Sequence, residues 1–201
     1  MNTVSALINA VIFLVTLIPV IRFFRKDGRW DVNRGKTAFR YFTCQSNVLC
    51  AAAALLTAVC QLTGALPEWV WILKYVGTAA VTVTMMTVLL FLGPVYSYKE
   101  LLKGFDLFMH LLTPLLALVS FCVFENRGMS FGLALTGLIP VVLYGLLYMY
   151  KILYAPEGRR WDDFYTFNRN GKWPAAFAAM LTGTFLICMG IMALQNIRIS
   201  P

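Results

Sequence analysis

Two short polar groups interrupt an otherwise apolar chain, and both carry side chains capable of nucleophilic or acid–base chemistry. The first is Thr43–Asn47, which opens a long apolar segment, and the second holds Asp106 and the only histidine, His110. Polar side chains are costly inside a bilayer, and those found there normally face a bundle interior, a water-filled cavity or a reaction site. These two groups are therefore the candidates for a functional site.

A hydroxyl and an imidazole at the same membrane depth can act as a nucleophile and its base. Thr43 and His110 each lie within roughly 10 Å of the start of an expected helix, and the two helices run in the same direction. Histidine has an unperturbed pKa of about 6.5, which suits proton transfer near neutrality. Asp106 lies one helical turn before His110, where a carboxylate can orient the imidazole.

The other polar residues of the first group are candidates for supporting roles. At helical spacing, Thr43, Ser46, Asn47 and Cys50 form one stripe. Gln45, Ser46 and Asn47 carry donors that suit an oxyanion. The same side chains equally suit hydrogen bonds between packed membrane helices, and a lone membrane histidine is often structurally paired. Spacing alone leaves both interpretations open.

The composition predicts an integral membrane protein. Of the 201 residues, 60% are hydrophobic, whereas soluble domains contain about 45–50% apolar residues. A transmembrane helix needs roughly 20 mostly apolar residues. Six segments qualify: 3–21, 41–63, 69–92, 105–123, 130–152 and 173–196. We therefore expect an all-α fold in which residues 1–201 form one six-helix transmembrane domain, in the cell membrane or an inner membrane.

The basic residues predict an orientation in the bilayer. Of the 17 lysines and arginines, 14 lie in or beside the connections at one end of the expected bundle, and three (Lys74, Arg127 and Arg198) lie toward the other end. The positive-inside rule places the basic connections in the cytoplasm and both termini outside. This orientation explains the net charge of +8 without a nucleic-acid partner. Lys74 is expected to extend its amine outward to the membrane surface.

No residue pattern points to a metal or an organic cofactor. The five cysteines all fall within expected spans and lack the spacing of metal ligands: Cys44, Cys50, Cys60, Cys122 and Cys188. Free, buried thiols are the expected state. The first span lacks a basic segment before it and is expected to be retained rather than cleaved as a signal peptide.

Three short motifs resemble those of the androgen-induced-gene family of membrane proteins, in its prokaryotic-type branch. They are Tyr41–Asn47, His110–Pro114 and Trp173–Pro174. Members of that family are multi-pass intramembrane threonine hydrolases that cleave fatty acid esters of hydroxy fatty acids. Their essential threonine and histidine match Thr43 and His110.

The resemblance implies a hydrolase mechanism without a cofactor. His110 would take the proton of Thr43, whose oxygen attacks the ester, and water would then release the acid. The expected partners are the lipid bilayer and a lipid or fatty-acid-ester substrate that enters from the side. Two other classes remain open: a transporter of a small solute or lipid, and a non-catalytic lipid-binding membrane protein. A transporter requires polar residues at every depth, whereas the later half of the 41–63 segment is mainly alanine and leucine.

Overall fold

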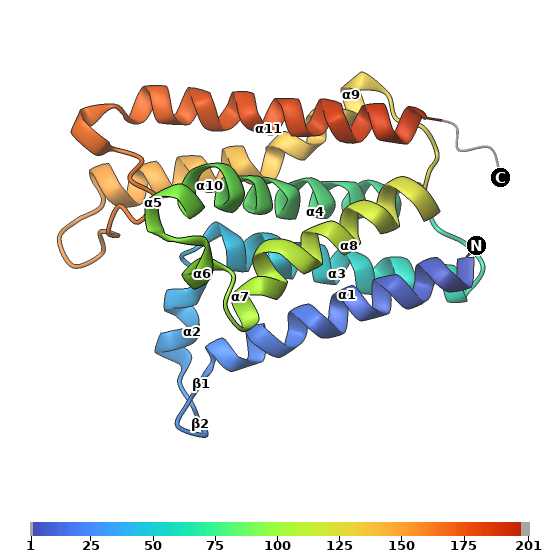
Figure 1. The fold of residues 1–201 in the computed structure, drawn as a ribbon, viewed down its shortest axis with the longest axis horizontal. Coiled ribbons are helices and arrows are strands. Elements are labelled where there is room, and N and C mark those ends of the chain that lie inside the picture. Colours follow the sequence, from blue (N-terminus) through green and yellow to red (C-terminus); the bar gives the residue numbers. More distant parts are fainter. Residues whose placement is uncertain (1, 198–201) are drawn as a thin grey trace.

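The protein is an all-α bundle of six helices long and apolar enough to cross a membrane, which confirms the expected fold (Figure 1). The computed structural model describes residues 2–197. The six spans are Thr3–Phe23, Phe42–Leu62, Glu68–Tyr96, Phe105–Phe124, Phe131–Tyr154 and Trp173–Asn196. Their bounds agree with the expected segments to within about four residues.

Three of the spans are continuous helices and three consist of shorter helical pieces. The continuous ones are α1 (Asn2–Phe23), α3 (Phe42–Leu62) and α11 (Trp173–Asn196). The third span comprises α4 (Glu68–Thr87), η1 (Val88–Leu92) and α5 (Gly93–Tyr96). The fourth comprises α7 (Phe105–Leu107), η2 (Phe108–Leu112), α8 (Thr113–Val119) and η3 (Ser120–Phe124). The fifth comprises α9 (Phe131–Ala134), η4 (Leu135–Leu138), α10 (Ile139–Met149) and η5 (Tyr150–Tyr154).

Prolines account for several of these changes of helix type. A proline has no N–H, so the carbonyl four residues before it loses its helical donor. The wide π-turn η2 lies just before Pro114, and the 3-10 segment η4 lies just before Pro140. His110 is the residue four positions before Pro114. The proline therefore loosens the helix at the histidine.

The two ends of the bundle differ in their connections. The connections 24–41, 97–104 and 155–172 lie at one end, which we call the basic end, and include β1 (Arg25–Lys26), β2 (Arg29–Trp30), α2 (Val32–Ala38), α6 (Tyr98–Leu101) and η6 (Arg169–Gly171). The short turns 63–67 and 125–130 lie at the opposite end, where α1 starts and α11 ends (Figure 1).

Close helix contacts hold α3 against α4 in the interior. A Cβ added at Gly77 of α4 would lie 2.9 Å from the Cα of Cys50, so the two backbones meet there. At mid-depth, Ile12, Cys50, Ala54, Val81 and Ala117 form one buried apolar cluster from four helices. We call this cluster the apolar layer; it separates the polar groups at the two ends.

A polar network occupies the interior at the end opposite the basic one. Asn9 joins two buried charged residues: its side-chain oxygen accepts from the Lys74 amine, and its nitrogen donates to Oε1 of Glu125. Ser5 and Ser120 also donate to that oxygen, at 2.9 and 2.7 Å. The expectation that Lys74 extends to the membrane surface was wrong. Lys74 is fully buried on the central helix α4, where a polar partner, rather than water, compensates its charge.

Replacing Lys74 by methionine should strongly destabilise the bundle, because the Glu125 carboxylate then stays buried without a compensating cation. The expected loss is about 3–5 kcal/mol, the range for breaking one side of a buried charge pair. The double variant Lys74→Met/Glu125→Gln should lose much less than the sum of the two single variants. Thermal unfolding of the purified protein in detergent measures this; strictly additive losses would contradict coupling through Asn9.

The orientation remains a prediction, and it has a direct test. The start of α1 and the end of α11 lie at the end opposite the basic one, so both should face outward; Arg198 lies outside the described residues. A cysteine added before α1 or after α11 should react with an impermeant maleimide in intact cells. Four of the five native cysteines are buried, which keeps the background low. Labelling that appears only after lysis would reverse the orientation.

Candidate functional site

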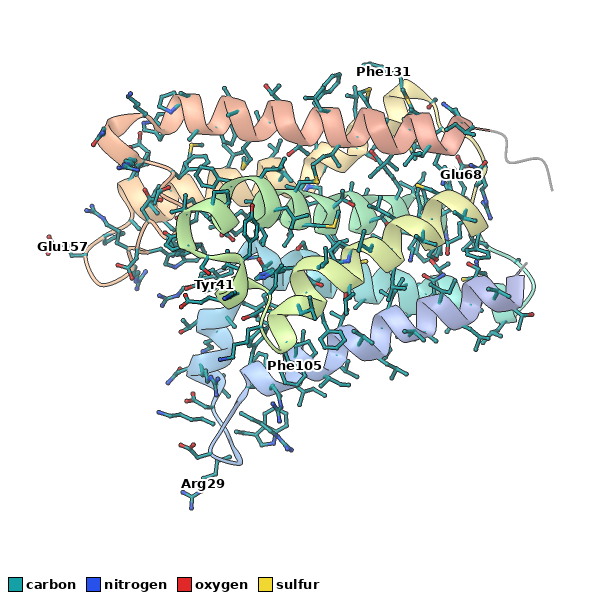
Figure 2. The ribbon with its side chains drawn as sticks, viewed as in Figure 1. Arg29, Tyr41, Glu68, Phe105, Phe131 and Glu157 are labelled. Carbon is teal, nitrogen blue, oxygen red and sulfur yellow. The ribbon has the colours of Figure 1, made fainter. Side chains whose placement is uncertain are left out.

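Thr43 is the second residue of the 21-residue helix α3. The residue just before this helix does not cap its first turn. α3 begins at Phe42, and the preceding Tyr41 is extended and makes no side-chain cap. Helix N-termini carry unpaired N–H groups and a partial positive charge. Both Tyr41 and Phe105, at the starts of the second and fourth spans, lie at the basic end (Figure 2). Thr43 is thus placed where developing negative charge is favoured.

Tyr165, on the long connection 155–172, supplies the missing cap. Its hydroxyl accepts the N–H of Phe42 at 3.1 Å, and its ring packs edge-on against that of Tyr144. The Tyr144 hydroxyl in turn donates to the carbonyl of Arg40 at 2.7 Å. Burial raises the pKa of Tyr165 to about 12. Its hydroxyl therefore keeps its proton at physiological pH and can donate a hydrogen bond.

A groove of about 380 Å³ runs from Thr43 along the outside of α4. Its walls come from α3, the α4–η1 segment, α10, the connection 155–172 and α11, and they are mostly apolar: Phe42, Val83, Met86, Val88, Leu90, Phe91, Leu92, Val141, Phe167, Ala176, Ala179, Met180 and Ile187 among others. Leu90 and Phe91 on its rim are 69% and 49% exposed and belong to a spanning helix. The groove therefore opens sideways, toward lipid.

Gln45 binds the backbone just before α3 rather than the groove. Its Nε2 donates to the carbonyl of Phe39 at 2.8 Å, and Phe39 precedes the helix that begins at Phe42. The side chain expected to serve an oxyanion thus joins the start of α3 to the end of α2.

Ser46 and Asn47 are buried and link α3 to its neighbours. Asn47 Nδ2 donates to the carbonyls of Thr43 and Met109, at 2.9 and 3.0 Å, so it joins the first turn of α3 to the segment that carries the histidine. Ser46 shares a 2.8 Å hydrogen bond with Thr84 of α4. Both residues therefore position the site. The Asn47 Oδ1 atom is buried without a hydrogen-bond partner among the described residues.

His110 is half-buried in the π-turn η2 and is held by the backbone. Its Nδ1 lies 2.6 Å from the carbonyl oxygen of Leu101. A carbonyl only accepts, so Nδ1 carries a proton, and in the neutral ring the lone pair is then on Nε2. Asp106, expected to orient the ring, is exposed, and the Leu101 carbonyl takes that place. The neutral imidazole is thus fixed in the tautomer that a base requires.

The structure brings the six candidate residues to one end of the bundle but not into one cavity. Thr43 lines the groove; Gln45, Ser46 and Asn47 hold the helix behind it; His110 follows the residue that Asn47 binds. Among the described residues no hydrogen bond joins Thr43 to His110. The expected matching depth is therefore present, whereas direct contact of the pair is not.

Sequence reasoning missed Tyr144 and Tyr165, which line the groove together with Thr43. Tyr144 and Tyr165 are 21 positions apart and more than 100 positions after Thr43, and no motif connects them. The available signal was the concentration of aromatic residues between Tyr144 and Phe167, which form a packed cluster at the basic end. In residues 2–197, no three histidine, cysteine or acidic side chains are grouped closely enough to hold a metal ion.

Comparisons of the chain with models of known families, with curated proteins and with solved structures found no match. The resemblance to the androgen-induced-gene family therefore rests on the three short motifs alone.

Replacing Tyr165 by phenylalanine should destabilise the basic end, because the Phe42 N–H loses its partner. A loss of about 1–2 kcal/mol is expected, as for a lost helix cap. Thermal unfolding in detergent measures the effect. Tyr154→Phe is the matched control, since Tyr154 is 69% exposed. Equal stability of the two variants would show that the cap contributes nothing.

Proposed function

We propose that the protein is an intramembrane hydrolase of lipid esters, with Thr43 as nucleophile and His110 as base. The observation that carries the proposal is the mostly apolar groove that is lined by a threonine in the first turn of a helix. A fatty acid ester of a hydroxy fatty acid, or a related acyl ester, fits such a site. Its chains would lie along the apolar walls and its carbonyl carbon beside the Thr43 oxygen.

The first step transfers the acyl group to the protein. The Thr43 proton passes to His110 Nε2, and the Thr43 oxygen bonds to the ester carbon. The carbon–oxygen bond to the leaving group then breaks, and the departing oxygen takes the proton from His110. The positive end of α3 and the Tyr165 hydroxyl stabilise the negative charge on the carbonyl oxygen during this step.

The second step regenerates the enzyme with water. His110 accepts a proton from water, whose oxygen bonds to the acyl carbon; the bond to Thr43 breaks, and Thr43 takes the proton back as the acid leaves. His110 suits both steps because its Nδ1 is held by the Leu101 carbonyl, which in the neutral ring leaves the lone pair on Nε2. Its approach to Thr43 is a substrate-bound event, since catalytic hydrogen bonds are often long before substrate binds. Asn47 joins the first turn of α3 to the segment that carries His110.

The two other function classes, a transporter and a non-catalytic lipid-binding protein, differ in how well they agree with the structure. A transport path would have to cross the apolar layer, where Ile12, Val81 and Ala117 pack without polar partners. This closed layer counts against a transporter. A non-catalytic lipid-binding protein would use the same groove, and only chemistry separates it from the hydrolase.

Thr43→Ala and His110→Ala should each reduce ester hydrolysis by at least 10²-fold, as expected when a nucleophile or its base is removed. The double variant should be no worse than either single one, because residues of one catalytic unit are not additive. Thr43→Ser should keep activity, since it retains the hydroxyl. The assay uses monodisperse protein in detergent and a panel of fatty acid esters.

Thr63→Ala is the matched control. Thr63 lies at the far end of the same helix and donates only to carbonyls of its own turn, so its replacement should leave turnover unchanged. Wild-type turnover by folded Thr43→Ala would end the proposal. Wild-type turnover by His110→Ala alone would keep the nucleophile and require a different base.

A further inference from the structure

The connection between the first two spans is a folded unit rather than a loose loop. We call residues 22–40 the basic unit; it contains the β1–β2 hairpin and α2. Asp31 caps α2 by accepting the N–H of Arg34 at 3.0 Å. The Arg34 side chain donates to the carbonyl of Arg25, which joins α2 to β1. A side chain at Gly35 would collide with the Phe24 ring, so α2 also packs against the end of α1.

The basic unit leaves the bundle sideways. In Figure 1, α2 and the hairpin run across the direction of the spanning helices, level with the ends of α1 and α3 at the basic end. Arg29 lies at the tip, well away from the bundle (Figure 2). If the spanning helices cross a bilayer, a unit that points sideways at the level of their ends lies beside the headgroups of the neighbouring lipid. It does not extend into the water above the protein.

The side chains of the basic unit suit an anionic interface. Its 19 residues include seven lysines and arginines and two aspartates, a net charge of +5. Trp30 is 65% exposed and Val32 56% exposed, although both belong to a folded element. Tryptophan prefers the headgroup level of a membrane, and basic residues near the surface attract anionic lipid. The combination indicates contact with lipid.

The hairpin borders a shallow depression that is open to the surroundings. It is lined by Lys26, Asp27, Arg29 and Trp30 on one side and by the start of α2 on the other. Of the two aspartates there, Asp31 is already engaged with the N–H of Arg34, and Asp27 is exposed. Lys26 and Arg29 are exposed and appear in no hydrogen bond through their side chains among the described contacts. They are available for a phosphate.

We propose that the basic unit is a binding site for the phosphate headgroup of an anionic phospholipid in the adjacent leaflet. Lys26 and Arg29 contact the phosphate from the hairpin, with Arg25 adding charge, and Trp30 enters the interface beside the glycerol region. The site is separate from the Thr43 groove and does not depend on ester hydrolysis. It ties the protein to anionic lipid and sets the height of α1 in the bilayer.

The experiment measures lipid selectivity with the full-length protein in phosphatidylcholine membranes. Spin-labelled phosphatidylglycerol and spin-labelled phosphatidylcholine are added in turn, and the motionally restricted fraction gives the relative association of each. The wild type should prefer phosphatidylglycerol, by about fivefold for each charge engaged. The variant Arg25→Gln/Lys26→Gln/Arg29→Gln should lose most of this preference.

A matched variant separates a site from overall charge. Lys99→Gln/Lys103→Gln/Arg159→Gln removes the same charge from exposed positions at the same end of the bundle and should keep the preference. Equal losses in both variants would overturn the proposal in favour of overall charge. A wild type without selectivity would overturn it outright.

Trp30 provides a second readout that does not depend on charge. Brominated phosphatidylglycerol should quench part of the tryptophan fluorescence, and Trp30→Phe should remove that part. If Trp30 instead contacts a soluble partner, bromination will not affect its emission, and this outcome also contradicts the proposal.

Discussion

A polar group inside a bilayer has no water to bind, so the polar side chains inside this bundle depend on partners within it. This constraint produces two polar regions and a gap between them. At one end Asn9 joins Lys74 to Glu125, and at the other Asn47 joins α3 to the segment that carries His110. The apolar layer keeps the two regions apart. The first region stabilises the bundle and contributes no residue to the groove beside Thr43, whereas the second borders that groove.

The fold was largely predictable from the sequence because the bilayer imposes lengths. A run of about 20 apolar residues leaves little choice but a spanning helix, and all six appear. The depth of Thr43 and His110 in the membrane was predicted in the same way, by counting residues from the start of each span. The pairing of side chains did not, because it depends on how the helices rotate and which neighbours they meet. Lys74 shows the difference: its position near a helix end predicted contact with water, but the neighbouring Asn9 lies close enough to bind it.

The orienting partner of His110 illustrates a second limit. Helical periodicity places Asp106 beside the histidine, and an ordinary α-helix would keep them on one face. Pro114 removes a helical donor, the chain widens into a π-turn, and the ring reaches the carbonyl of Leu101 instead. A proline four residues ahead is visible in the sequence, but the backbone atom that replaces the carboxylate is not. Tyr165 was hidden for a similar reason, since its contact with α3 spans 123 positions.

Five threonines line the groove: Thr43, Thr84, Thr87, Thr166 and Thr184. Their surroundings differ, and the difference indicates which of them is best suited to act as the nucleophile. Thr84 and Thr184 lie inside helices and donate to carbonyls four residues earlier, so their protons are already engaged and their oxygens face no free N–H group. Thr43 differs in both respects. Its hydroxyl donates to no carbonyl in the hydrogen bonds of the described residues, and it is the one of the five that lies in the first turn of a helix, at the positive end of α3. A hydroxyl in that position becomes an alkoxide more readily than one that donates to its own helix, and this favours Thr43 as the reacting residue of the groove.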